Sequence, residues 1–451
     1  MTHWMQKLAR FKRWGLVGLG LLVLAACATV GTTVTSKEWK TKAVPLSQGV
    51  IKEVDGKRTQ VRYPGFRENR SFDQWPTYAA DSPAYPPPKK AQMPTGIKGD
   101  PKKGQALMKG PCTACHLIPD ASVWPAGNVG PDLRTIGHRG LPDSHLYQVI
   151  YDPRVTFGAD SPMAPFGASG MWNAEQIMHV VAYLQTLKGN PPGVPEKVTD
   201  DKQWNPFTRD VVQLDFGDPM DLTANPALGL ADSVAVPLWS KAGPKGQSCA
   251  GCHGGIGAPD AQRPLGVIKS MVGVGAAYPK WIAKHRRMMS VEDYLSVHAP
   301  ETTGHEMPTQ GEQNLTMSVL VKMQSNGMPY QLDRKDANVG AAVKRGEELF
   351  NRRVGQRGQA CADCHTERGG GHKFLGGRFL GNLGKDTMIN HPYFRTSQGA
   401  LWDVRLRMQW CMTPLLANML PGDSPEYADL EAFMVSKQQG QPLLVPRRPS
   451  H

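Results

Sequence analysis

Three short strings of the sequence each place two cysteines and a histidine where a porphyrin could be attached. The strings have the form Cys-x-x-Cys-His and occupy residues 112–116, 249–253 and 361–365. Two thiols separated by two residues can form thioether bonds to a porphyrin while the adjacent histidine ligates its iron, which is the attachment pattern of c-type heme. We therefore expect three covalently bound heme c groups. The attaching thiols would be Cys112, Cys115, Cys249, Cys252, Cys361 and Cys364, and the proximal iron ligands His116, His253 and His365.

Zinc binding and thiol redox chemistry are the other uses of paired cysteines. A structural zinc site needs four ligands, usually from two clusters within about 20 residues of each other, whereas these strings lie more than 100 residues apart. A thioredoxin-like pair does not require a histidine directly after it. Both alternatives therefore fit the sequence less well than heme.

A sixth ligand for each iron can be sought at a common distance downstream. Met163 follows the first histidine by 47 residues, His298 follows the second by 45, and Cys411 follows the third by 46. Met163 lies in a proline-flanked loop, and methionine is a common ligand of c-type heme. His305 and Met307 are rivals of His298 for the second iron. The shared spacing predicts three units built on one plan.

Cys411 is accounted for neither by the porphyrins nor by the lipid anchor discussed below. Arg407 precedes it by four residues in a stretch that we expect to be helical, so both side chains would lie on one face. A guanidinium beside a thiol favours the thiolate, which is both a nucleophile and an iron ligand, and it could also hold the sulfonate oxygens of thiosulfate. A Cys-ligated heme has a lower potential than a Met-ligated one, so the first heme would be the electron sink. The alternatives are an inert buried cysteine and a surface arginine.

Helices must position these loops, and capping signals mark where they begin. Asp100 and Asp336 each start a stretch that we expect to form an opening helix before a heme string. Asn173, Ser290 and Ser424 begin later helices, the first two with a capping-box partner three residues on. In the middle unit the apolar stripe of the closing helix is Leu315, Val319, Leu320 and Met323. The pattern predicts an all-α fold of three cytochrome c-type heme domains with extensive irregular loops.

The first 26 residues are typical of a targeting segment. Basic residues between positions 7 and 13 precede an apolar run over 15–26, which is short for a membrane-spanning helix. The run ends Leu-Ala-Ala-Cys, which resembles the lipobox of bacterial lipoproteins, so Cys27 would carry a lipid. An ordinary cleaved signal and an uncleaved anchor are the alternatives, and each of them also exports the chain. We therefore expect a periplasmic protein that is held to the membrane through Cys27.

Composition supports a multi-domain chain with an anionic substrate or partner. The 451 residues are 40% hydrophobic, enough for several cores, and the formal net charge is +13. The basic residues are scattered and accompany no nucleic-acid-reading module, so nucleic acid is not an expected partner.

Two parts of the chain resemble cytochromes of the thiosulfate-oxidising Sox system. Residues 98–187 resemble the monoheme cytochrome SoxX, and residues 203–447 resemble its diheme partner SoxA. The motifs that carry the first likeness are Gly130-Pro131-Asp132-Leu133, Met163-Ala164-Pro165-Phe166-Gly167 and Val180-Val181-Ala182-Tyr183-Leu184. Those of the second are Gln247-Ser248-Cys249, Gly358-Gln359-Ala360-Cys361, Tyr393-Phe394-Arg395, the Arg407 and Cys411 pair, and Ser424-Pro425-Glu426-Tyr427. The chain thus looks like a fusion of the two subunits.

The resemblance implies an L-cysteine S-thiosulfotransferase. Such enzymes join thiosulfate oxidatively to a cysteine on the C-terminal arm of the carrier SoxY, held with SoxZ, and pass two electrons to a c-type cytochrome. Cys411 would then be the active-site heme ligand, in the family often a persulfide, and Arg407 its basic neighbour. Fusion, the lipobox and His298, where the family usually has cysteine, depart from the pattern. The alternatives are a tetrathionate-forming thiosulfate dehydrogenase, which needs no carrier, and a non-catalytic membrane-tethered electron-transfer cytochrome.

The expected organisation follows from these assignments. It consists of a signal peptide (1–26), a tether and N-terminal arm (27–97), a SoxX-like domain (98–187), a linker or interface segment (188–245), a first SoxA-like domain (246–330) and a second that carries the active site (331–447).

Overall fold

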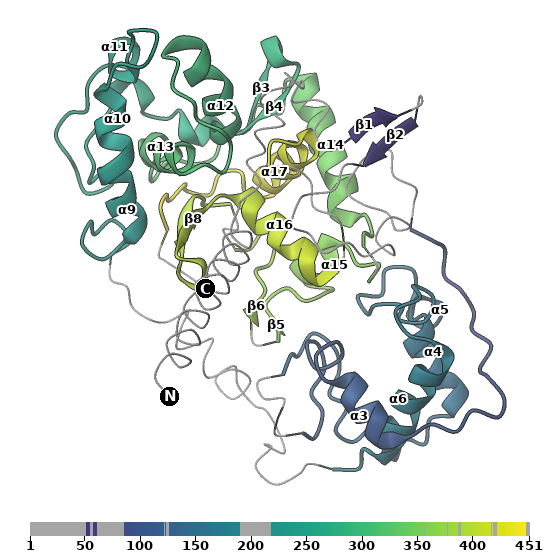
Figure 1. The fold of residues 1–451 in the computed structure, drawn as a ribbon. Coiled ribbons are helices and arrows are strands. Elements are labelled where there is room, and N and C mark those ends of the chain that lie inside the picture. Colours follow the sequence, from purple (N-terminus) through teal and green to yellow (C-terminus); the bar gives the residue numbers. More distant parts are fainter. Residues whose placement is uncertain are drawn as a thin grey trace, which may run out of the picture.

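The structure, a computed structural model, describes residues 51–54, 57–60, 85–120, 122, 126–189, 218–355, 357–376, 378–386, 389–415, 417 and 422–447. The expected signal peptide with Cys27, and residues 190–217 of the expected linker, lie outside the described residues. Helices of three successive parts of the chain form three neighbouring groups (Figure 1), so the predicted all-α class is confirmed. Within these described ranges, no helix is long and apolar enough to cross a bilayer.

The first unit is a helical domain around its heme string. It contains α3 (Pro101–Met108), η4 (Ile136–Arg139), α4 (Asp143–Tyr151), α5 (Arg154–Phe157) and α6 (Ala174–Thr186). Asp100 caps α3, and Asn173 and Gln176 form both bonds of the predicted capping box on α6. Helices α3 and α6 cross closely at Gly104, where a Cβ atom would lie 2.0 Å from the His179 carbonyl oxygen. The opening and closing helices therefore pack directly on each other.

The middle unit starts earlier in the chain than its heme string suggests. It contains α9 (Pro226–Leu230), the π-helical turn η5 (Ala231–Ala235), α10 (Val236–Ser240), α11 (Cys249–His253), η6 (Lys269–Met271), η7 (Gly275–Ala277), η8 (Ala283–His285), α12 (Val291–Thr302) and α13 (Glu312–Met323). Strands β3 (Lys280–Ile282) and β4 (Arg287–Met289) form a small antiparallel pair. Leu228, Ala231 and Trp239 are buried in one core with the stripe of α13. Residues 226–240, which we assign to the linker from sequence, thus belong to the core of this unit.

The third unit repeats the plan of the first. It contains α14 (Ala337–Asn351), α15 (Cys361–His365), η9 (Thr396–Gln398), α16 (Val404–Leu415) and α17 (Pro425–Gln438), and antiparallel pairs of β5 (Phe374–Leu375) with β6 (Arg378–Phe379) and of β7 (Tyr393–Arg395) with β8 (Ala400–Trp402). Helices α14 and α17 cross at Gly346, where a Cβ would lie 2.0 Å from the Asp429 carbonyl oxygen, as at Gly104. Asp336 caps α14 as predicted, whereas Ser424 precedes α17 without a side-chain capping bond.

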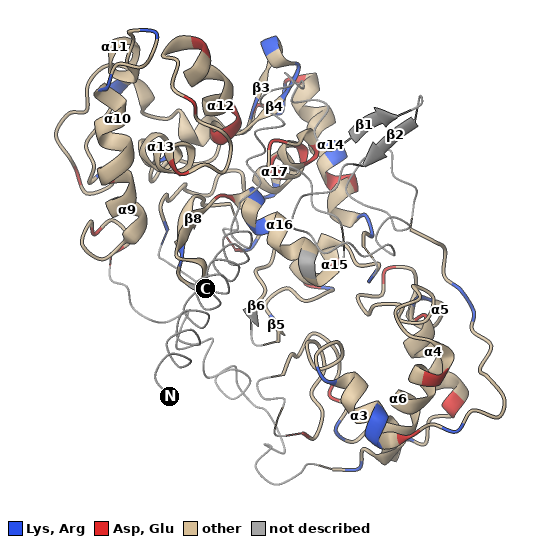
Figure 2. Cartoon of the chain, viewed as in Figure 1, with Lys and Arg blue, Asp and Glu red and all other residues tan. Residues whose placement is uncertain are grey.

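A buried ion network joins the middle and third units. The Arg405 guanidinium on α16 donates to both oxygens of Asp293 on α12, each at 2.5 Å, and to the Gly422 carbonyl at 2.7 Å. The Lys322 ammonium donates to Glu292 at 2.8 Å, and all four charged side chains are buried. Figure 2 shows acidic positions on α12 and α17 and basic positions at the start of α16 around this junction. The network therefore fixes α16 against α12.

The first and third units also meet directly. The Gly376 N–H donates to the Ala114 carbonyl at 2.8 Å, and the Phe374 N–H donates to the Asn128 side chain at 2.7 Å. The described part of the N-terminal arm, from residue 85 onward, lies along α4 and α5, where its Lys89 N–H donates to Asp152 at 2.8 Å. Outside these units the described residues form one hairpin, β1 (Ile51–Val54) with β2 (Lys57–Gln60).

Candidate functional site

The predicted reactive cysteine lies beside the histidine of the third heme string. Helix α16 presents Cys411, and α15 presents His365, to which the Cys411 thiol is hydrogen bonded. The His365 Nδ1 lies 2.8 Å from the Gly381 carbonyl oxygen, which leaves Nε2 for a metal or a thiol. The structure thus brings together the two predicted ligands of the third iron.

The electrostatic surroundings of Cys411 favour its thiolate. Burial by itself favours the neutral thiol, but Arg407, His365 and Arg395 outweigh burial, so the pKa of Cys411 is lowered. Arg395 belongs to the Tyr393-Phe394-Arg395 motif, but the sequence alone does not place it near Cys411. A thiolate can act both as a nucleophile and as an iron ligand.

Two arginines share one indole beside Cys411. The guanidinium carbon of Arg407 lies 4.6 Å from the centroid of the Trp410 ring, and that of Arg395 lies 5.3 Å from it. Arg395 also lies over the Trp402 ring at 4.8 Å and donates to the Tyr393 hydroxyl at 3.3 Å. The Arg407 Nη1 is buried without a hydrogen-bond partner among the described residues. A buried donor of this kind is suited to an oxyanion.

The first heme string has the same histidine arrangement as the third. The His116 Nδ1 lies 2.8 Å from the Pro131 carbonyl oxygen, and burial lowers the pKa of His116, which keeps the imidazole neutral. Gly130 lies so close that a Cβ there would be 2.3 Å from the His116 ring. Met163 packs against the core of the same unit. The histidine and thiols of this string therefore suit a covalently held heme.

The proximal histidine of the second string, His253, faces His298 and not His305. The ring centroids of His253 and His298 are 6.0 Å apart. The His305 Nε2 instead lies 3.1 Å from the Lys241 carbonyl oxygen, and Met307 is fully buried in the core. Burial, and then His253, lower the pKa of His298, which favours the neutral, ligating form. This geometry favours His298 among the three candidates.

Replacing His298 should change the spin state of the second heme. We expect His298→Ala to convert this heme from low to high spin, because alanine offers no ligand atom, while His305→Ala leaves it low spin. Electron paramagnetic resonance of the ferric protein measures both. A high-spin signal in His305→Ala and none in His298→Ala would assign the ligand to His305.

The thiols of the first and third strings lie close to each other. Cys115 and Cys364 interact electrostatically. The positive charge of Arg357 interacts with Cys112 and Cys115 of the first string and with Cys364 of the third. Burial lowers the pKa of Arg357, and its Nε has no hydrogen-bond partner among the described residues. Sequence reasoning missed Arg357 because no motif links it to either string. The second string lies apart from this pair, on α11 (Figure 1).

Comparison with known protein families shows what these heme-binding units are similar to. The SoxA/TsdA cytochrome c domain family matches residues 235–330 and 345–443. The general cytochrome c family matches residues 101–188. The SoxA subunit of the L-cysteine S-thiosulfotransferase from Pseudaminobacter salicylatoxidans is 29% identical over 228 residues, which cover 50% of this chain and 74% of that subunit. Residues 101–188, 235–330 and 345–443 are therefore cytochrome c domains, the last two similar to those of SoxA and TsdA. Such domains bind heme covalently, and the chain is similar to sulfur-transferring enzymes.

Two further proteins are similar to this chain. A protein of Aquifex aeolicus described as an uncharacterized lipoprotein is 38% identical over 89 residues, which cover 20% of this chain and 39% of that protein. The crystal structure of SoxXA from P. pantotrophus covers 55% of this chain and 85% of its own, with 23% identity and a TM-score of 0.42.

Proposed function

We propose that this cytochrome is an L-cysteine S-thiosulfotransferase that couples thiosulfate to the carrier SoxYZ. The observation that carries the proposal is the Cys411 thiol, bonded to His365 and beside Arg407, whose buried Nη1 has no partner among the described residues. The reaction forms a sulfur–sulfur bond between the terminal sulfur of thiosulfate and the cysteine thiolate on the SoxY arm. Two electrons leave the joined sulfurs, and no sulfur or oxygen atom is lost.

Arg407 and Cys411 would contact different ends of thiosulfate. The Arg407 guanidinium binds sulfonate oxygens, because its charge is permanent and its donors are planar. The terminal sulfur is then directed to Cys411 on the same face of α16. Trp410 holds the guanidinium by a cation–π contact at 4.6 Å. These residues bind and orient the anion, and the thiolate form of Cys411 makes the sulfur contact.

The chain would hold three hemes c through its three strings. The free thiols fit this group, as do the Nδ1 contacts of His116 and His365, which leave each Nε2 for an iron. Heme, when bound, accepts and releases single electrons. His116 with Met163, His253 with His298, and His365 with Cys411 would be the ligand pairs. Because the first and third units meet at the Gly376–Ala114 and Phe374–Asn128 hydrogen bonds, electrons would pass from the third site to the first and on to a c-type cytochrome.

The cellular partners follow from the same proposal. The acidic partner expected for a chain of net charge +13 is the SoxY arm together with the thiosulfate anion. Lipidation of Cys27 would hold the protein to the membrane on the periplasmic side, where it would bind SoxYZ. A second candidate function is tetrathionate formation from two thiosulfates. It is favoured by one observation: the family that matches residues 235–330 and 345–443 is named for both SoxA and TsdA, and TsdBA is a thiosulfate dehydrogenase.

Replacing Arg407 should slow turnover while leaving heme attachment intact. We expect Arg407→Ala to reduce the rate of thiosulfate-dependent cytochrome reduction by roughly tenfold or more, because a charge-assisted bond contributes about 1.5–3 kcal/mol. Arg334→Ala, which removes an exposed arginine outside the site, is the matched control and should keep the wild-type rate. An unchanged rate in Arg407→Ala would show that Arg407 does not bind thiosulfate.

A further inference from the structure

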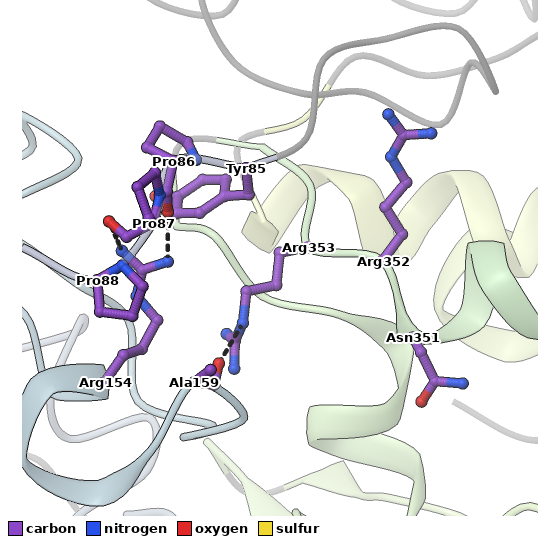
Figure 3. A pocket seen from close by; sticks show the side chains of 9 residues that line it. All are labelled: Tyr85, Pro86, Pro87, Pro88, Arg154, Ala159, Asn351, Arg352 and Arg353. Carbon is purple, nitrogen blue, oxygen red and sulfur yellow. Dashed lines mark hydrogen bonds between the residues drawn. The ribbon is translucent and has the colours of Figure 1, made fainter.

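An arginine of the third unit is hydrogen bonded to the loop that carries Met163. The Arg353 Nη2 donates to the Ser161 carbonyl at 2.7 Å, and its Nε donates to the Ala159 carbonyl at 3.1 Å. Figure 3 shows Arg353 reaching Ala159 across the cavity where the two units and the N-terminal arm meet. The Arg353 side chain is only 11% exposed, and its bond to Ser161 is partly buried, whereas its bond to Ala159 is exposed. One guanidinium therefore fixes two carbonyls of the loop.

The remaining residues before Met163 are held from the same side. The Gln359 side chain donates to the Pro162 carbonyl at 2.5 Å. Arg368 forms an ion pair with Asp160. Each residue from 159 to 162 is thus bonded to the third unit. The first unit gives this loop a turn, in which the Ser161 N–H donates to the Gly158 carbonyl at 3.0 Å.

Arg353 is itself anchored at the active-site heme string. Its Nη1 donates to the Gly358 carbonyl at 2.6 Å and pairs with the Asp363 carboxylate at 3.2 Å. Asp363 lies between Cys361 and Cys364, and its carboxylate also accepts the Ala360 N–H at 2.9 Å. The same side chain therefore contacts the heme-binding helix of one unit and the distal loop of another.

We propose that Arg353 is a positioning residue that holds Met163 in place as the ligand of the first heme, so that methionine ligation depends on docking of the third unit. This inference rests on the proposed ligation by Met163. Because methionine ligation raises the reduction potential, docking would make the first heme a better acceptor only when the active-site heme is beside it. Gln359 supports the same loop through a contact that involves neither Asp363 nor the heme string.

The test is spectroscopic and uses the full-length, heme-loaded protein. We expect Arg353→Ala and Gln359→Ala each to weaken the long-wavelength sulfur-to-iron charge-transfer band of the ferric first heme and to lower its reduction potential. The ratio of Met-bound to Met-free heme should fall about tenfold, because each variant loses at least one partly buried hydrogen bond to the loop. Arg352→Ala, which replaces the next arginine in the wall of the same cavity, should keep both the band and the potential.

The outcomes separate this inference from the ligand assignment beneath it. Met163→Ala should abolish the band, and if wild type and Met163→Ala have the same spectrum, the proposed ligation fails. If Met163→Ala loses the band but Gln359→Ala and Arg353→Ala keep it with unchanged potential, the role of Arg353 is overturned. Gln359→Ala keeps the test decisive if Arg353→Ala fails to fold, because Gln359 makes no ion pair within the third unit.

Discussion

Replacing Cys411 with alanine should abolish turnover without removing a heme. The thiol is the group that contacts the substrate sulfur in our proposal, and its loss should reduce thiosulfate-dependent cytochrome reduction by at least about a thousandfold, as expected for an essential active-site group. Heme attachment at the third string uses Cys361 and Cys364, so heme content should stay the same. The rate of cytochrome reduction gives the turnover, and heme staining together with the intact mass of the protein gives the heme content.

Two results would contradict this role of Cys411. Wild-type turnover in Cys411→Ala would show that the Cys411 thiol is not needed for the reaction. Loss of the third heme in the same variant would make the residue structural, since the rate could then not be assigned to the thiol. Cys411→Ser separates sulfur chemistry from side-chain size, and we expect it to be as inactive as alanine.

Breaking the buried ion pair between the middle and third units should strongly destabilise the protein. Arg405→Met keeps the side-chain size but leaves Asp293 buried without its 2.5 Å partner contacts. Removing one partner of a buried pair costs about 3–5 kcal/mol, and the cation that would remain near Asp293, Arg287, is 3.7 Å away, too far for a hydrogen bond. Urea unfolding of the heme-loaded protein, monitored by circular dichroism, gives the change in the free energy of unfolding.

The matched control for this prediction is an ion pair at the surface of the third unit. Arg345 pairs with Asp429 at 2.7 Å, but the Arg345 side chain is 47% exposed. Arg345→Met should therefore change the free energy of unfolding by about 1 kcal/mol or less. Equal effects of Arg405→Met and Arg345→Met would show that the buried network does not hold the two units together.

Local signals predicted the helices because they depend on neighbours in sequence. The capping boxes at Asn173 and Ser290 form as expected, since each needs only a partner three residues away. The segment 226–240 was assigned to a linker, although Asn225 and Pro226 form a helix start. Pro237 interrupts the hydrogen-bonding pattern there, and the π-helical turn at 231–235 lets the helical segment continue.

The site itself was predicted only where a motif carries it. The attachment strings and the spacing to Met163, His298 and Cys411 are visible in the sequence, and the ligand assignments remain predictions. Arg353 lies 192 residues from Ser161, whose carbonyl it binds, so no local pattern indicates their contact. Likewise, Arg395 reaches the Cys411 region because β7 and β8 fold back onto α16, which the sequence does not reveal.

In the proposed reaction, thiosulfate is joined to a carrier protein. The most direct measurement follows reduction of a c-type cytochrome by the heme-loaded protein and thiosulfate, with and without SoxYZ, while mass spectrometry records the mass of SoxY. We predict that reduction requires SoxYZ and that SoxY gains the mass of one thiosulfate. Reduction without SoxYZ, with tetrathionate as product, would contradict this proposal and assign the protein to the thiosulfate dehydrogenases.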